Sequence, residues 1–260
     1  MTHFQAALLG VVQGVTEFLP VSSSAHLILA PRLLGWPDQG LGFDAVMHLG
    51  TLAALLVYFR DDLWRMVRGM DRRLAVLLVA ATVPAGLAGL LLEKIISSRL
   101  RNPLIIAATM VGWALVMWVA DREAGRRLRA VKSPADVGWG AGMTVGLAQV
   151  LALVPGTSRS GVTITAGLFT GMSRPTAARF AFLLGIPITA AAGGLKTLFF
   201  LRHGADPAIL APLATGLVAS FVAGLVAVWF LVNFLETRSL TPFVIYRCAL
   251  GIVLVILFAS

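Results

Sequence analysis

Two polar segments interrupt an otherwise apolar chain, and each combines residue types that could bind or attack a phosphate. Residues 13–26 have the sequence QGVTEFLPVSSSAH, which places the carboxylate of Glu17, three serines and the imidazole of His26 close together. Residues 155–163 have the sequence PGTSRSGVT, in which Arg159 stands between hydroxyl side chains. A guanidinium can grip two phosphate oxygens at once, and hydroxyls can donate to the others.

Local signals suggest how each segment is built. Pro20 cannot continue the helix before it, and Ser22 or Ser23 is a favourable N-cap for the next helix. The backbone N–H groups at such a helix start favour an anion. Glu17 alone would repel an anion, so we expect it to bind a cation or to act as a base. The candidate phosphate-binding residues are Ser22, Ser24, Gly156, Thr157, Ser158, Ser160, Thr163 and Arg174.

These residues also have structural interpretations. A hydroxyl in a membrane helix often bonds only to backbone or to a neighbouring helix. His26 and Gln13 could be held by hydrogen bonds alone, and Arg159 could form only a structural ion pair with Glu17. For His48 we favour the structural interpretation. Basic residues expected near the lipid interface, some by snorkelling, are Arg174, Arg179, Lys196 and Arg247.

The composition indicates that most of the chain is surrounded by lipid. Of the 260 residues, 58% are hydrophobic and 13% are charged, whereas soluble domains have about 25% charged residues. The net charge of +9 arises largely from short loops, where it indicates topology and contact with lipid head groups. We therefore expect no nucleic acid partner. The single cysteine, Cys248, excludes a disulfide within the chain.

Hydropathy predicts an all-α integral membrane protein. A span requires about 20 apolar residues. The regions 4–34 and 138–172 are apolar but broken by Pro, Gly, Ser and Thr into pieces too short to span, which is typical of re-entrant helical hairpins. We predict six transmembrane helices, near 43–59, 74–92, 103–120, 178–200, 212–235 and 243–259.

The distribution of basic residues predicts the orientation. The loops at 60–73, 121–136 and 236–242 contain more Lys and Arg than the opposite loops, which hold Arg32, Lys94, Arg99, Arg101 and Arg202. The positive-inside rule assigns the more basic set to the cytoplasm. The first re-entrant segment then enters from the outer side and the second from the inner side.

The two halves of the chain resemble each other. Pro20 and Pro155 precede the two Ser-rich stretches, and further landmarks recur in the same order at offsets of 135 to 139 residues: Leu49-Gly50 with Leu184-Gly185, Pro103 with Pro242, and Gly112 with Gly251. Repeat one covers about 1–122 and repeat two about 136–260, joined by a basic cytoplasmic loop at about 121–136. Three crossings in each half predict an inverted-topology repeat within one membrane domain, residues 1–260. The alternative is chance similarity between apolar helices.

At its two polar segments the sequence resembles the undecaprenyl-diphosphate phosphatase family of the bacitracin-resistance type. The first family motif is matched by Gln13, Glu17, the stretch 20–23 and His26. The second is matched by Pro155, Gly156, Ser158, Arg159, Ser160 and Thr163. Many members have Glu where this chain has Gln13, which leaves one carboxylate where two could hold a cation.

This resemblance implies hydrolysis of undecaprenyl diphosphate to undecaprenyl phosphate and inorganic phosphate. Such a reaction recycles a lipid carrier for cell-wall synthesis and gives bacitracin resistance. It also implies a divalent cation, Mg²⁺ or Ca²⁺, with Glu17 and Gln13 as candidate metal ligands. The implied catalytic residues are Glu17, Ser23, His26 and Arg159, and either Ser23 or His26 could attack phosphorus. The implied location is the bacterial cytoplasmic membrane, with the active site facing its outer side.

The main alternative function is a transporter or flippase for an anionic lipid, because inverted repeats with broken helices are common in transporters. A transporter has no need of a histidine beside a carboxylate and a phosphate-binding arginine, so we favour the enzyme. The expected partners are the polyprenyl diphosphate substrate and membrane lipids, and a homodimer is compatible with the sequence.

Overall fold

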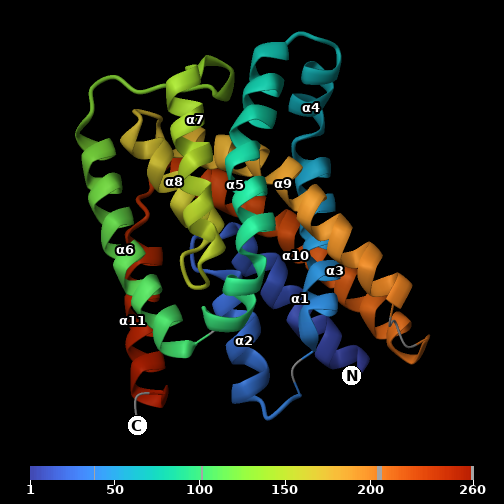
Figure 1. Ribbon diagram of the computed structural model, residues 1–260. Helices are drawn as coiled ribbons and strands as arrows, with labels where there is room; N and C mark the ends of the chain where they lie inside the picture. Colours follow the sequence, from blue (N-terminus) through green and yellow to red (C-terminus); the bar gives the residue numbers. More distant parts are fainter. Residues whose placement is uncertain (38, 101, 204–206, 259–260) are drawn as a thin grey trace.

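The computed structural model describes residues 1–37, 39–100, 102–203 and 207–258 (Figure 1). Arg101 and Ala259, which belong to a predicted loop and a predicted span, lie outside the described residues, as do the side chains at 41, 93–99, 201, 203, 207 and 208. Within the described range the chain is helical and has no strand, apart from one isolated bridge between Val131 and Met172. The predicted all-α class is confirmed.

Each predicted span corresponds to a helix. Five helices are long and apolar enough to cross a membrane, and a sixth span results if α3 and α4 count as one span bent by 73°. The short helix α4 (Arg60–Val67) follows α3 directly. The six helices that match the predictions are α3 (Gly40–Tyr58), α5 (Arg72–Arg99), α6 (Pro103–Arg126), α9 (Arg174–His203), α10 (Pro207–Thr237) and α11 (Thr241–Phe258).

Helix α4 corrects the prediction that residues 60–73 form a loop. Its charged residues Asp61 and Arg65 point to the outside, whereas Leu63 and Met66 pack against the hydrophobic core. The sequence is therefore amphipathic, and its apolar face favours a helix over a fully solvated loop.

The two broken regions form helical hairpins whose turns lie inside the molecule (Figure 1). The first consists of α1 (His3–Phe18) and α2 (Ser23–Leu33). The second consists of α7 (Trp139–Ala148), the short 3-10 helix η2 (Gln149–Leu153) and α8 (Arg159–Phe169). The first hairpin enters from the end that contains the N-terminus, and the second enters from the opposite end.

The halves are interlocked through pairs of helices. Helix α1 packs on α10, α7 packs on α5, α3 packs on α9, and α6 packs on α11. Glycines allow the closest of these approaches: a Cβ on Gly14 would lie 2.6 Å from the carbonyl oxygen of Ser220 in α10. A Cβ on Gly146 of α7 would likewise collide with the carbonyl oxygen of Ala81 in α5. Each hairpin is thus fixed by a long helix of the other half.

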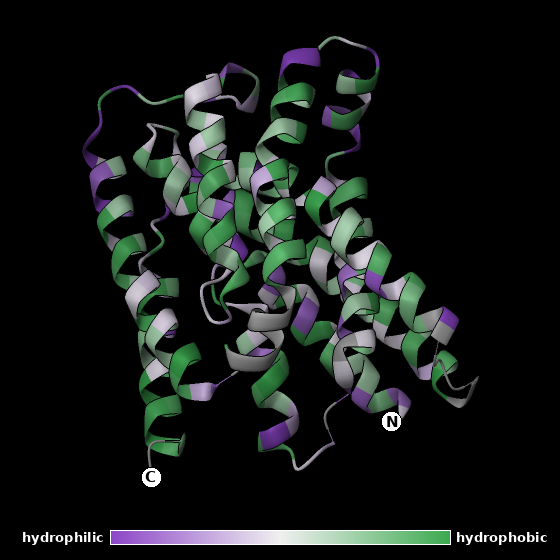
Figure 2. Cartoon of the chain, in the orientation of Figure 1, coloured by the Kyte–Doolittle hydropathy of each residue, from purple (hydrophilic) through white to green (hydrophobic). Residues whose placement is uncertain are grey.

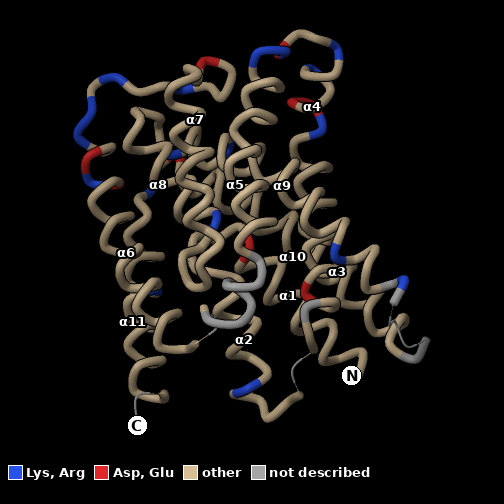
Figure 3. Tube along the Cα trace, viewed as in Figure 1, with Lys and Arg blue, Asp and Glu red and all other residues tan. Residues whose placement is uncertain are grey.

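Basic residues and hydrophobic residues occupy different parts of the molecule. Lys and Arg gather at the end that carries α4 and the α6–α7 connection (Figure 3), and hydrophobic residues cover the helices between the two ends (Figure 2). Beneath the first turn, Phe18 packs edge-on against Phe182 of α9, with ring centroids 5.4 Å apart. This contact fixes the end of α1, and therefore the neighbouring Glu17, against α9.

Candidate active site

The two turns have the same unusual backbone conformation. Ser22 and Ser158 precede α2 and α8, and their φ angles are 75° and 71°. A positive φ is uncommon outside glycine, costs about 1–3 kcal/mol, and is concentrated at functional sites. Gly156 has a φ of 89°, and a Cβ there would collide with the side chain of Thr109. Both turns are therefore held in strained shapes by the structure around them.

Glu17 joins the two turns. Its Oε1 accepts a hydrogen bond from Nη2 of Arg159 at 2.8 Å, although the two residues are 142 positions apart. Its Oε2 accepts from Nε2 of Gln13 at 3.0 Å and from the hydroxyl of Ser23 at 2.7 Å. The carboxylate is buried. A hydroxyl that donates to a carboxylate is arranged like an activated nucleophile and its base.

Arg159 is oriented by α9. Its Nη1 donates to the carbonyl oxygen of Gly185 at 3.0 Å and to the hydroxyl of Thr189 at 2.6 Å. The guanidinium lies directly against Gly185, where a Cβ would approach Nη1 to 2.8 Å. About a fifth of the Arg159 side chain (19%) remains exposed. The group is fixed on one edge and still accessible, which suits a phosphate-binding arginine.

His26 contacts α11 through Tyr246. Its Nδ1 lies 2.8 Å from the carbonyl oxygen of Ser22, and its Nε2 lies 2.6 Å from the hydroxyl of Tyr246. The rings of His26 and Tyr246 are nearly parallel, at 9°. Sequence analysis placed His26 beside Glu17 in function, but the structure gives the two residues different partners.

The remaining serine hydroxyls bond within each turn, and that of Ser160 also joins the second turn to the first. Ser22 bonds to Ser24, and Ser158 bonds to Ser160, each pair with an oxygen–oxygen distance of 3.2 Å. The hydroxyl of Ser160 donates to the carbonyl oxygen of Leu19 at 3.2 Å. The two turns are therefore in direct contact.

Two other candidate phosphate-binding residues, Thr157 and Thr163, make no side-chain hydrogen bond to the other turn among the described residues. Thr163 donates to the carbonyl oxygen of Arg159, one turn earlier in α8, at 2.8 Å. The hydroxyl of Thr157 is buried and has no hydrogen-bond partner among the described residues. Ser158 caps α8 through a hydrogen bond from the N–H of Gly161 at 3.2 Å.

Arg174 lies outside this group. Its guanidinium donates to the carboxylate and to the carbonyl oxygen of Asp121, at the end of α6. Asp121 is buried. The two residues therefore form an ion pair between α6 and α9, and the structure does not bring Arg174 together with the turns.

The family assignment rests on the whole chain as well as on this geometry. Residues 6–253 match the model of the family described as bacitracin resistance protein BacA. The chain belongs to the BacA family. Since the match covers nearly the whole length, it includes both hairpins and all the long helices.

Curated relatives of this BacA-family chain share one name. Undecaprenyl-diphosphatase 2 of Stutzerimonas stutzeri (strain A1501) is 46% identical over 271 aligned residues, covering 100% of both chains. Undecaprenyl-diphosphatase of Teredinibacter turnerae is 44% identical and covers 98% of this chain and 99% of the relative. Undecaprenyl-diphosphatase of Trichlorobacter lovleyi is 47% identical and covers 97% and 96%.

His48, for which the sequence favours a structural interpretation, lies near Glu17 in this BacA-family chain. Its Nδ1 lies 2.7 Å from the carbonyl oxygen of Asp44, and its Nε2 lies 3.5 Å from Oε2 of Glu17. The second distance is longer than a hydrogen bond of about 2.7–3.2 Å. His48 is in an apolar run that gave no sign of its partner, because the contact joins α3 to α1.

The predicted location of Arg247 was wrong. It was expected to snorkel to the interface, but it is fully buried. Its guanidinium donates to the carbonyl oxygen of Pro20 in the first turn at 3.2 Å, and to those of Gly156 and Thr157 in the second turn at 3.0 Å each. A fourth bond reaches the carbonyl oxygen of Met110 in α6. The prediction was wrong because a lone arginine in an apolar run is compatible with either location.

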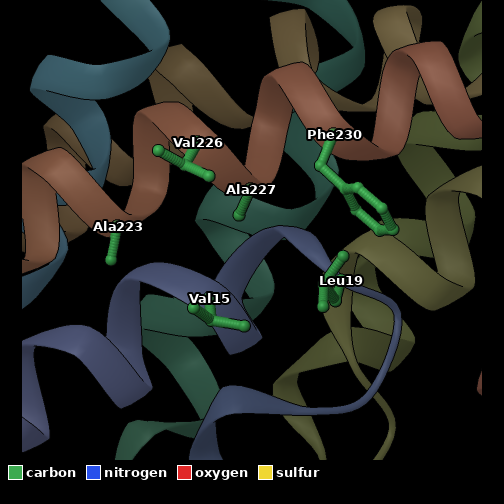
Figure 4. A pocket seen from close by; sticks show the side chains of 6 residues that line it. All are labelled: Val15, Leu19, Ala223, Val226, Ala227 and Phe230. Carbon is green, nitrogen blue, oxygen red and sulfur yellow. The ribbon is translucent and has the colours of Figure 1, made fainter.

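An apolar groove of about 340 Å³ lies between α1 and α10 (Figure 4). Val15 lies on α1 and Leu19 directly follows it, and helix geometry places Glu17 roughly opposite Val15 on α1. Leu19 also borders the first turn, since its carbonyl oxygen accepts from Ser160. The lining residues are Val15, Leu19, Ala223, Val226, Ala227 and Phe230.

Proposed function

We propose that this protein hydrolyses undecaprenyl diphosphate to undecaprenyl phosphate and inorganic phosphate. The observation that supports this most strongly is the buried ion pair between Glu17 and Arg159, which joins two Ser-rich helix starts from different halves of the chain. The relatives named undecaprenyl-diphosphatase support the choice of substrate. In a bacterium the reaction recycles the lipid carrier for cell-wall synthesis and counteracts bacitracin.

Phosphate binding uses groups that the turns already present. The terminal phosphate takes the place of Glu17 on one edge of Arg159, while Gly185 and Thr189 keep the other edge fixed. Backbone N–H groups at the starts of α2 and α8 donate to the remaining oxygens, as at other helix N-termini that bind anions. Stabilising the charge that is spread over these oxygens supplies most of the rate in phosphoryl transfer.

Ser23 is the attacking group in this mechanism, because its hydroxyl donates to Oε2 of Glu17 at 2.7 Å. Its Oγ forms a bond to the terminal phosphorus, its proton passes to Glu17, and the bond from phosphorus to the bridging oxygen breaks to release undecaprenyl phosphate. Water then attacks the phosphoserine, and Glu17 returns its proton to Oγ. The proton that the water loses leaves with the inorganic phosphate.

A divalent cation, Mg²⁺ or Ca²⁺, fits beside Glu17. Oε1 of Gln13 is buried and has no hydrogen-bond partner among the described residues, while the amide nitrogen of the same side chain donates to Glu17. Carboxylate and amide oxygens are ligands that both cations accept. Glu17 and Gln13 would hold the ion, which would neutralise charge on the diphosphate. Because Arg159 already balances the charge of Glu17, cation binding depends on the substrate's own phosphates.

The membrane arrangement completes the proposal. The two hairpins are re-entrant, and the repeats at about 1–122 and 136–260 have inverted topology. The packing between the halves supports this, because α1 of the first half packs on α10 of the second, and α7 of the second half packs on α5 of the first. The basic end faces the cytoplasm, so the α1–α2 hairpin opens to the outer side of the cytoplasmic membrane. The groove beside Leu19 is suited to part of the polyprenyl tail.

The reaction can be tested with purified protein in detergent. We expect inorganic phosphate from undecaprenyl diphosphate but not from undecaprenyl phosphate, and we expect EDTA to stop its release. The lipid product, identified by mass spectrometry, should be the monophosphate. If folded protein binds the diphosphate yet releases no phosphate with any divalent cation, a lipid transporter becomes the better account.

A further inference from the structure

The two ring nitrogens of His26 have different partners, and these partners define what each nitrogen can do. Nδ1 lies 2.8 Å from the carbonyl oxygen of Ser22, which can only accept, so Nδ1 carries a hydrogen. In the neutral ring, Nε2 then holds the lone pair. The hydroxyl of Tyr246 lies 2.6 Å from Nε2 and donates to it.

Tyr246 covers the one nitrogen of His26 that could react. A neutral imidazole attacks phosphorus, or accepts a proton, only through its lone pair. That lone pair is occupied by the Tyr246 hydroxyl. If His26 is protonated instead, Nε2–H donates to the same oxygen, and the nitrogen is still covered.

The position of Tyr246 is set by its neighbour in sequence. Arg247 is fully buried and bonds to carbonyl oxygens of both turns, so this part of α11 is fixed relative to the turns. The Tyr246 ring lies nearly parallel to that of His26, with centroids 5.7 Å apart. Tyr246 itself is 44% exposed, so it contacts His26 from the surface of the molecule rather than from its core.

We propose that Tyr246 is a positioning residue for His26: its hydroxyl covers Nε2, so that His26 does not attack phosphorus. The inference rests on the proposed phosphatase function and assigns roles within it. Ser23, which donates to Glu17, is left as the attacking group.

The covering of Nε2 can be measured directly. Diethyl pyrocarbonate modifies an imidazole nitrogen through its free lone pair, and mass spectrometry reports the rate at each histidine. We expect His26 to react several-fold faster in Tyr246→Phe than in the wild type, because the variant loses the hydroxyl and keeps the ring. The ¹⁵N resonance of Nε2 should also move toward that of an unbonded nitrogen.

The controls separate this effect from general loosening. Tyr58→Phe removes the hydroxyl of the chain's only other tyrosine and should leave the His26 rate unchanged. The rate at His3, whose Nδ1 lies 2.8 Å from the hydroxyl of Thr215 in α10, should be the same in all three proteins. Equal His26 rates and an unmoved Nε2 resonance in the wild type and Tyr246→Phe would overturn the proposal.

A second measurement needs only the wild type. Undecaprenyl diphosphate labelled with ³²P on its terminal phosphate is mixed with the enzyme, and the reaction is quenched at high pH, which preserves phosphohistidine. We expect no labelled His26, and a labelled His26 would overturn the proposal even if Tyr246→Phe does not fold. Absence of phosphate release by the wild type would instead count against the phosphatase function, whatever the modification rates.

Discussion

At the scale of single residues, Arg159 and Arg174 have similar sequence surroundings but different ion-pair partners. Both follow hydroxyl-bearing residues near α8, and both were assigned to phosphate binding from the sequence. Arg159 reaches Glu17 of the other half, whereas Arg174 pairs with the buried Asp121. The difference arises from which long helix each side chain meets, and local sequence does not encode that.

This contrast predicts the behaviour of Arg174→Ala. The substitution leaves the Asp121 carboxylate buried without its partner, so the folded state should lose about 1–3 kcal/mol. The KM for undecaprenyl diphosphate should remain near that of the wild type. Thermal unfolding in detergent and steady-state kinetics check both statements. Arg60→Ala, which removes an exposed arginine of α4 whose neighbour Asp61 is also exposed, is the control for stability. A large rise in KM would return Arg174 to the phosphate site.

At the scale of elements, α11 fastens the two turns together through Arg247. Four carbonyl oxygens, of Met110, Pro20, Gly156 and Thr157, accept hydrogen bonds from this one side chain. The strained backbone at Ser22 and Ser158 is maintained by such tertiary contacts.

Arg247→Ala should therefore loosen both turns at once. Leaving buried carbonyl groups without a donor costs about 1–3 kcal/mol each, so we expect the unfolding midpoint to fall by several degrees and phosphate release to be nearly lost. Arg247→Lys keeps the charge but cannot reach all four oxygens, and it should rescue only part of the stability. Arg238→Ala, at an exposed position after α10, is the matched control. Wild-type stability in Arg247→Ala would contradict this role.

The elements were largely predictable from the sequence, and the contacts between them were not. Long apolar runs gave the six long helices, because lipid requires about 20 apolar residues in each span. Pro20 and Pro155 revealed the two breaks, since proline cannot continue a helix. By contrast, the roles of His48 and Arg247 depend on crossings between α3 and α1 and between α11 and both turns. Such crossings leave no local pattern.

At the scale of the whole molecule, two hairpins from opposite ends meet in the interior (Figure 1). Each half contributes one turn, and only the pair provides both the carboxylate and the guanidinium. The basic residues gather at one end (Figure 3), which fixes the orientation that we propose.

Cysteine labelling tests this orientation. Pro37→Cys, between α2 and α3, should react with a membrane-impermeant maleimide in intact spheroplasts. Lys132→Cys, in the basic loop after α6, should react only after the membrane is opened. Both variants are made with Cys248→Ala, which removes the only native thiol. The reverse labelling pattern would place the α1–α2 hairpin on the cytoplasmic side.

The most direct test of the central claim, that one phosphatase site is formed by both turns, is the rate of phosphate release by Glu17→Gln and Arg159→Ala. Each variant removes one half of the ion pair, so we predict that each lowers kcat/KM by roughly 10²–10³-fold with the fold retained. Glu123→Gln and Arg126→Ala, which alter an exposed ion pair at the end of α6, should leave it unchanged. Near-wild-type rates in folded Glu17→Gln and Arg159→Ala would show that the chemistry occurs elsewhere in the molecule.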